Sequence, residues 1–209
     1  PRPIETRLIW KRGETWKVAS YLWLSDGSDA KLLDGAGPVE IPVVDSAGTA
    51  FRHIVPSREE CNVCHEASPG FVLGFSEIQL NHKLPDDSST QLSRLLESGT
   101  LSGSLGGPVA KVTDPEENTR LVKGYVQGNC VQCHNGGVAI DFGHENFLQN
   151  TINVEGRDGT LIVPGNPDQS AFYRIFSEGG MPPLGVQLID RETVDLFGTW
   201  ITSLQHSIR

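Results

Sequence analysis

The chain is poor in sulfur-containing residues and has no long apolar run. Its 209 residues include one methionine and four cysteines. No stretch is long and apolar enough to span a membrane, so we do not expect an integral membrane protein. Hydrophobic residues make up only 37%, against 23 glycines and 13 prolines, which indicates a loop-rich globular chain.

Positive charge is also scarce. The chain has 17 lysines and arginines against 26 acidic residues, which gives a formal net charge of −9 and a pI of about 5.1. This balance argues against nucleic acid or an anionic membrane as the main partner.

The four cysteines all fall within two copies of one motif, Cys-x-x-Cys-His, at residues 61–65 and 130–134. This pattern is typical of covalent haem c attachment, in which two thiols bond to the porphyrin and the histidine binds the iron. The sequence therefore predicts two haem c groups. The expected attachment residues are Cys61, Cys64, Cys130 and Cys133, and the expected iron ligands are His65 and His134.

Three other cysteine chemistries compete with this interpretation. Zinc-binding cysteine pairs usually lie about 15–20 residues apart, whereas these pairs are much further apart and each has its own histidine. A thioredoxin-like dithiol would open a helix in a βαβ pattern, which the flanking sequence does not show. Disulfides within a motif would be strained, although pairing between the two motifs stays possible.

The sixth iron ligand of the second haem is predicted to be Met181. This methionine lies in the Gly/Pro-rich segment 179–185. Prolines stiffen such a loop, and glycines let its backbone approach a porphyrin closely. The alternative is a methionine that fills a gap in the core.

The first haem has no methionine nearby, because none precedes Met181. We favour His82 as its sixth ligand, and His53 is the second choice. A ligand from the second segment, such as His144, or an open site stays possible, and His206 is a further candidate.

The pattern of residues predicts an α+β protein in three parts. Residues 1–56 read as antiparallel hairpins, with turns near residues 12–14 and 45–48. Residues 57–112 form the first haem segment and residues 113–209 the second. Expected helix starts are Ser57, Asp114 followed by Pro115, and Asp190.

The second segment, roughly residues 113–205, resembles a class I cytochrome c domain. The matching residues are Gly124-Tyr125, Cys130 to His134, Met181-Pro182-Pro183 and Trp200. The resemblance implies a mainly helical haem domain with His134 and Met181 as axial ligands. It also implies that the first and last helices cross with Gly124 against Phe197 or Trp200.

The chain as a whole resembles a bacterial dihaem c-type cytochrome family. The resemblance rests on Pro56-Ser57-Arg58, Cys61 to His65, Val72 to Phe75, Gln79 to Asn81 and Val163 to Pro167, together with Met181-Pro182-Pro183. Some such proteins are fused to, or encoded beside, extracellular carbohydrate-active enzymes or dehydrogenases. The resemblance therefore implies an electron acceptor for an enzyme of that kind.

The leading functional prediction is one-electron transfer through two haems by an exported protein, periplasmic or extracellular, that meets a redox partner protein. One alternative is a dihaem enzyme such as a peroxidase, with an open first haem and Glu59, Glu60 or His53 as acid or base. Another is a haem-bearing docking module of a larger extracellular oxidoreductase.

Overall fold

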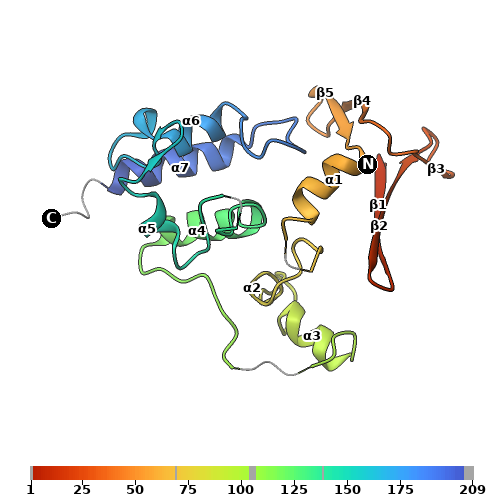
Figure 1. Cartoon of the computed structure of the whole chain (residues 1–209), viewed down its shortest axis with the longest axis horizontal. Helices are drawn as coiled ribbons and strands as arrows, with labels where there is room; N and C mark the ends of the chain where they lie inside the picture. Colours follow the sequence, from red (N-terminus) through yellow and green to blue (C-terminus); the bar gives the residue numbers. More distant parts are fainter. Residues whose placement is uncertain (1, 69, 104–106, 138, 205–209) are drawn as a thin grey trace.

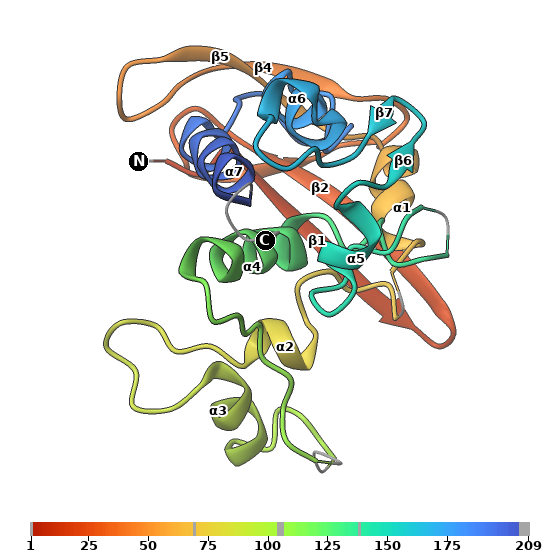
Figure 2. The same ribbon diagram turned by 90° about the vertical axis from the view of Figure 1, so that its left-hand side faces the viewer.

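The computed structural model describes residues 2–68, 70–103, 107–137 and 139–204. Strands dominate the first quarter of the chain and helices the remainder, so the protein is an α+β protein (Figure 1). Strands β1 to β5 lie at one end of the molecule and helices α4 to α7 at the other, with α1 between them (Figure 1). Figure 2 shows α2 and α3 below the rest of the chain.

The N-terminal sheet is antiparallel, with the order β1 (Glu5–Arg12), β2 (Thr15–Trp23) and β3 (Ala30–Leu32). Gly13 adopts φ +61° in the tight turn between β1 and β2, a conformation that favours glycine. The predicted first hairpin is therefore confirmed.

A second hairpin pairs β4 (Val39–Val44) with β5 (Ala50–Val55). The Asp45 carboxylate closes its turn by accepting hydrogen bonds from the backbone N–H groups of Ala47 and Thr49, both at 2.8 Å. Aspartate favours such turns because its side chain can bond to the backbone just ahead of it. The last residue of β5, Val55, is buried at the point where the chain enters α1.

Three short helices follow the hairpins: α1 (Arg58–His65), α2 (Glu77–Leu80) and α3 (Gln91–Glu97). Leu80 of α2 and Leu92 of α3 are buried, and the two helices pack together as a small lobe (Figure 1).

The C-terminal helical part begins with α4 (Glu117–Asn129) and α5 (Phe147–Thr151). A two-stranded ribbon follows, β6 (Glu155–Gly156) with β7 (Gly159–Thr160), and then the 3₁₀ turn η1 (Pro167–Gln169), α6 (Ala171–Ser177) and α7 (Arg191–Ser203). No helix in the described part of the chain is long and apolar enough to cross a membrane.

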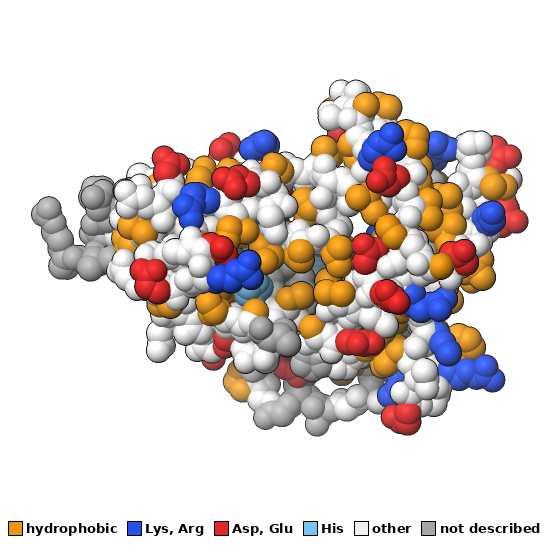
Figure 3. All heavy atoms as spheres, turned by 45° about the horizontal axis from the view of Figure 1, so that its top comes forward, with side chains coloured by type: hydrophobic (Ala, Val, Ile, Leu, Met, Phe, Trp, Pro, Cys, Tyr) orange, Lys and Arg blue, Asp and Glu red, His pale blue; other side chains and the backbone are white. Residues whose placement is uncertain are grey.

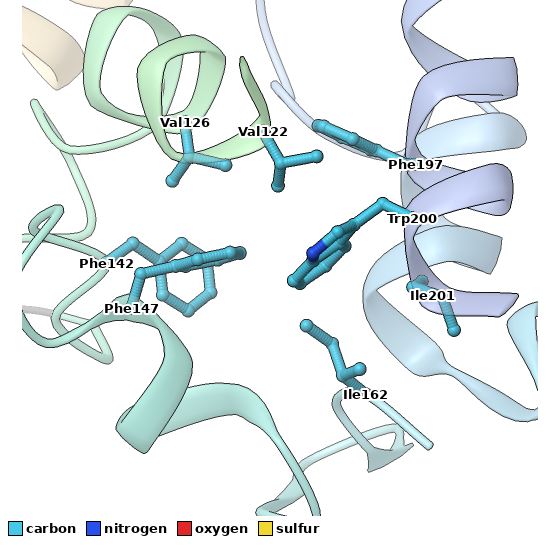
Figure 4. Close-up of a cluster of buried hydrophobic side chains, with 8 residues drawn as sticks. All are labelled: Val122, Val126, Phe142, Phe147, Ile162, Phe197, Trp200 and Ile201. Carbon is cyan, nitrogen blue, oxygen red and sulfur yellow. The ribbon is translucent and has the colours of Figure 1, made fainter. Parts of the chain in front are cut away.

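The main hydrophobic core lies within this C-terminal part, where α4 and α7 face each other across aromatic rings (Figure 4). Trp200 at its centre is fully buried, and its indole N–H donates to the Thr119 hydroxyl at 2.9 Å. The buried members of the core are Val122, Val126, Phe142, Phe147, Ile162, Phe197, Trp200 and Ile201.

Helices α4 and α7 pack against each other, but the expected contact of Gly124 with Phe197 or Trp200 is wrong. A Cβ atom added at Gly124 would meet nothing within 4 Å, so this glycine does not allow a close approach. The neighbouring Tyr125 meets the Phe197 ring edge-on instead, at 5.6 Å and 88°. The crossing is thus filled by side chains rather than by backbone contact.

The start of α4 also differs from the prediction. Glu116, not Asp114, caps the helix, because its carboxylate accepts hydrogen bonds from the N–H groups of Asn118 and Thr119. The Asp114 carboxylate instead pairs with the Lys123 ammonium group, at 3.2 Å. In contrast, Asp190 caps α7 as predicted, by accepting from the Thr193 N–H at 3.0 Å.

We expect Thr119→Val to destabilise the protein by about 1–3 kcal/mol, because it leaves the buried Trp200 N–H without an acceptor. The exposed Thr202→Val on α7 is the matched control and should change stability by less than about 0.5 kcal/mol. Urea unfolding of both variants measures the difference. Equal effects would contradict the role assigned to the Thr119–Trp200 hydrogen bond.

Candidate functional site

The first Cys-x-x-Cys-His motif lies on α1. The predicted capping box starts this helix: Ser57 Oγ accepts from Glu60 N–H at 3.1 Å, and Glu60 Oε2 accepts from Ser57 N–H at 2.7 Å. Since residues three and four apart share one face of a helix, α1 presents Cys61, Cys64 and His65 on the same side.

The imidazole of His65 is held by a backbone carbonyl. Its Nδ1 atom lies 2.7 Å from the Phe71 oxygen, so Nδ1 carries the proton and Nε2 keeps a free lone pair. Phe71 has φ +68°, an uncommon conformation for a bulky residue. Its ring stacks on Trp16 of β2, with centroids 5.1 Å apart and planes 10° apart. The N-terminal sheet thereby helps to hold the segment that orients His65.

The second motif follows α4 directly. Cys130 is the C-cap of that helix, and the N–H groups of Cys133 and His134 both donate to the Cys130 carbonyl, at 3.1 and 2.9 Å. Burial raises the pKa of the Cys130 thiol to about 12. The motif is therefore a tight turn fixed at the end of a core helix.

His134 is oriented in the same way as His65. Its Nδ1 lies 3.3 Å from the Ile140 carbonyl, and its ring stacks on Phe142 at 4.2 Å with planes 3° apart. Burial lowers the pKa of His134, which favours the neutral imidazole that binds metals.

Both motifs thus share one supporting interaction that the sequence analysis missed. In each, the carbonyl that accepts from Nδ1 belongs to the residue six positions after the histidine. Histidines that bind metals almost always donate their second ring N–H to such an acceptor. A backbone carbonyl is present at every residue, so no sequence signal marks these two.

The fold brings the two motifs together although they are far apart in the sequence. Burial raises the pKa of the Cys64 thiol, and the nearby Cys133 thiol of the other motif raises it further. Beside them, the Asn135 side-chain amide donates to the Ala67 carbonyl at 3.0 Å.

A cavity of about 260 Å³ lies between the N-terminal sheet and α1. Cys61 and His65 lie on its helix side, and apolar side chains of β1, β2 and the segment after β3 line the opposite wall. Two guanidinium groups, those of Arg7 and Arg58, also line it. Asp34 lines it as well, and Arg7 is already paired with the Glu5 carboxylate. The cavity next to the first motif is therefore mainly apolar, with residues of both charges at its wall.

The candidate sixth ligands near the first motif differ in what their rings contact. His82 is exposed, and its Nδ1 atom lies 2.6 Å from the Gln79 carbonyl oxygen. Its Nε2 atom takes no part in this hydrogen bond. His53 instead has its Nε2 on the Glu5 carboxylate at 2.9 Å, in a partly buried pair. Neither histidine lines the cavity.

The other candidates lie in the C-terminal part or beyond the described chain. Met181 is 44% exposed in the loop between α6 and α7. His144 precedes α5, where its backbone N–H donates to the Gln127 side chain at 3.1 Å. His206 lies outside the described residues.

The described residues do not form a cluster of three or more His, Cys, Asp or Glu side chains arranged to hold a bare metal ion. All four cysteines are free thiols.

Comparison with family models, with curated proteins and with solved structures gives no match to this chain.

We expect Glu5→Gln to lower stability at pH 7 by about 1–2 kcal/mol. Burial raises the pKa of Glu5, but hydrogen bonds and charge interactions with Arg7 and His53 outweigh it and leave this pKa below its usual 4.5. A lowered pKa stabilises the fold above the unfolded-state value, and the effect is lost as pH falls through the folded-state value. The difference from wild type should therefore shrink below about pH 4.5.

Unfolding by urea across a pH series measures this difference. Glu14→Gln, at a fully exposed turn position, is the control and should leave stability unchanged at every pH. A stability loss in Glu5→Gln that persists unchanged at low pH would contradict the ionic role of Glu5.

Proposed function

We propose that this chain is a dihaem c-type cytochrome that transfers electrons. One observation carries the proposal: each Cys-x-x-Cys-His motif holds its histidine by Nδ1 on a carbonyl six residues later. Each Nε2 is then available to an iron beside two free thiols. Bound haem would supply reversible one-electron chemistry at the iron.

The surroundings of the motifs suit a porphyrin, which is an apolar disc with two carboxylates. The cavity beside Cys61 and His65 is mainly apolar, and Arg58 at its wall offers a cation to one of these carboxylates, whereas Arg7 is already paired with Glu5. The cavity is smaller than the whole ring, so only part of a porphyrin would enter it.

Apolar side chains left exposed around the motifs support the same proposal. Val63 lies inside the first motif and is 55% exposed, and Ile140, whose carbonyl holds His134, is 38% exposed. Figure 3 shows hydrophobic side chains gathered across the middle of one face, next to a histidine. Contiguous apolar surface on a protein marks a place where a ligand or partner binds.

For the axial ligands, we propose His65 with His82 at the first iron, and His134 with Met181 at the second. The free Nε2 of His82 favours it over His53, whose Nε2 already bonds Glu5. A methionine ligand raises the reduction potential, so electrons would pass from the first site to the second.

The enzyme alternative has less support. Of the acid–base groups considered for it, Glu60 caps α1 and His53 pairs with Glu5. As an electron carrier, the protein would exchange electrons with a redox partner protein, for example a dehydrogenase or a carbohydrate-active oxidoreductase. We place this exchange in the bacterial periplasm or outside the cell.

Expression with a c-type haem maturation system should give a protein whose intact mass includes two haems that denaturation does not remove. Cys61→Ala/Cys64→Ala and Cys130→Ala/Cys133→Ala should each lose one haem. A wild-type mass without covalent haem would contradict the proposal.

The axial ligands are tested on that holoprotein by spin state. His82→Ala should convert one of two low-spin haems to high spin, and Met181→Ala should abolish the sulfur-to-iron charge-transfer band. His53→Ala is the control and should leave both haems low-spin. A high-spin haem in His53→Ala but not in His82→Ala would reverse the assignment at the first site.

A further inference from the structure

The contact between the two motifs joins residues that stand next to the two histidines. Ala67 follows His65 by two residues, and Asn135 follows His134 directly. Their hydrogen bond of 3.0 Å therefore links the ends of the two motifs. The second cysteine of each motif, Cys64 and Cys133, lies at the same contact.

Both the nitrogen and the oxygen of the Asn135 side-chain amide make hydrogen bonds at this contact. Its Nδ2 also lies 3.4 Å from the Gln132 carbonyl within its own motif, and its Oδ1 accepts from the Gly137 N–H at 3.0 Å. These local bonds fix the orientation of the amide that reaches Ala67. Asn135 is thus held by the second motif and points its donor at the first.

Covalent attachment at the cysteines means that a contact between the motifs also sets the distance between the two bound haems. A thioether sulfur is bonded to a carbon attached directly to the porphyrin ring. Haems attached to both motifs would therefore have their attached edges near this contact.

We propose that the two haem sites exchange electrons directly across the contact between the two motifs, with Asn135 as the positioning residue that holds the second site against the first. This proposal rests on the proposed function and gives the route of the transfer within the chain. With both haems bound, the transfer would move one electron from the reduced site to the oxidised site, with no bond formed or broken and no proton moved.

Circular dichroism of the oxidised holoprotein in the Soret region tests the proposal, since two porphyrins in close contact couple their transitions and give a couplet of opposite signs. We expect a couplet in the wild type. We expect a single-signed band in Cys61→Ala/Cys64→Ala, which keeps only the second site.

Asn135→Ala should reduce the amplitude of the couplet about two-fold or more. Without the hydrogen bond to Ala67, the second site is held less firmly against the first. Asn129→Ala is the matched control: its amide also donates to a backbone carbonyl, at 2.9 Å, but within α4, on Tyr125. The control should keep the full couplet and both haems.

The outcomes separate this proposal from the proposed function. Two covalent haems with a single-signed Soret band in the wild type would overturn the direct route and leave the cytochrome assignment intact. Fewer than two haems would overturn both. An equal loss of the couplet in Asn129→Ala and Asn135→Ala would contradict the positioning role of Asn135. If Asn135→Ala does not bind both haems, the Soret bands of the wild type and of Cys61→Ala/Cys64→Ala still test direct transfer between the two sites.

Discussion

The contact between the two Cys-x-x-Cys-His motifs constrains the whole arrangement of the chain. For Cys64 to meet Cys133, the C-terminal end of α1 must lie against the turn that follows α4. Strands β1 to β5 then extend from one side of this contact and the α4–α7 core from the other (Figure 1). The Asn135–Ala67 hydrogen bond connects the part of the chain that contains this core to the end of the first motif.

The histidines of the two motifs make similar hydrogen bonds, but different parts of the fold hold them in place. His65 relies on the Phe71 carbonyl, and Phe71 in turn stacks on Trp16 of the N-terminal sheet. His134 relies on the Ile140 carbonyl and on the ring of Phe142, which belongs to the aromatic core around Trp200. The sheet therefore has a structural role at the first site comparable to that of the helical core at the second.

The sequence predicts those features that depend on neighbouring residues. The two hairpins, the Ser57–Glu60 capping box and the Asp190 cap all follow from local side-chain bonding, and all are present. The start of α4 was mispredicted because Asp114 has a partner, Lys123, that competes with the capping role. Gly124 was misplaced because the crossing of α4 and α7 is filled by Tyr125 and its aromatic neighbours.

The features of the site that depend on tertiary structure had no sequence signal. The carbonyls of Phe71 and Ile140 act through backbone atoms, and the meeting of Cys64 with Cys133 depends on packing between distant segments. The cavity beside Cys61 likewise needs strands and a helix from separate parts of the chain. The residue types and their spacing identify the two motifs in the sequence, whereas only the fold shows that the motifs lie next to each other.

We propose that two haem sites of unequal ligation work as one electron-transfer unit. Potentiometric titration of the holoprotein, followed by its visible spectrum, measures this. We expect two one-electron steps per chain, and the step that is lost in Cys61→Ala/Cys64→Ala should be the one at the lower potential. A single one-electron step, or a first site that is reduced at the higher potential, would contradict it.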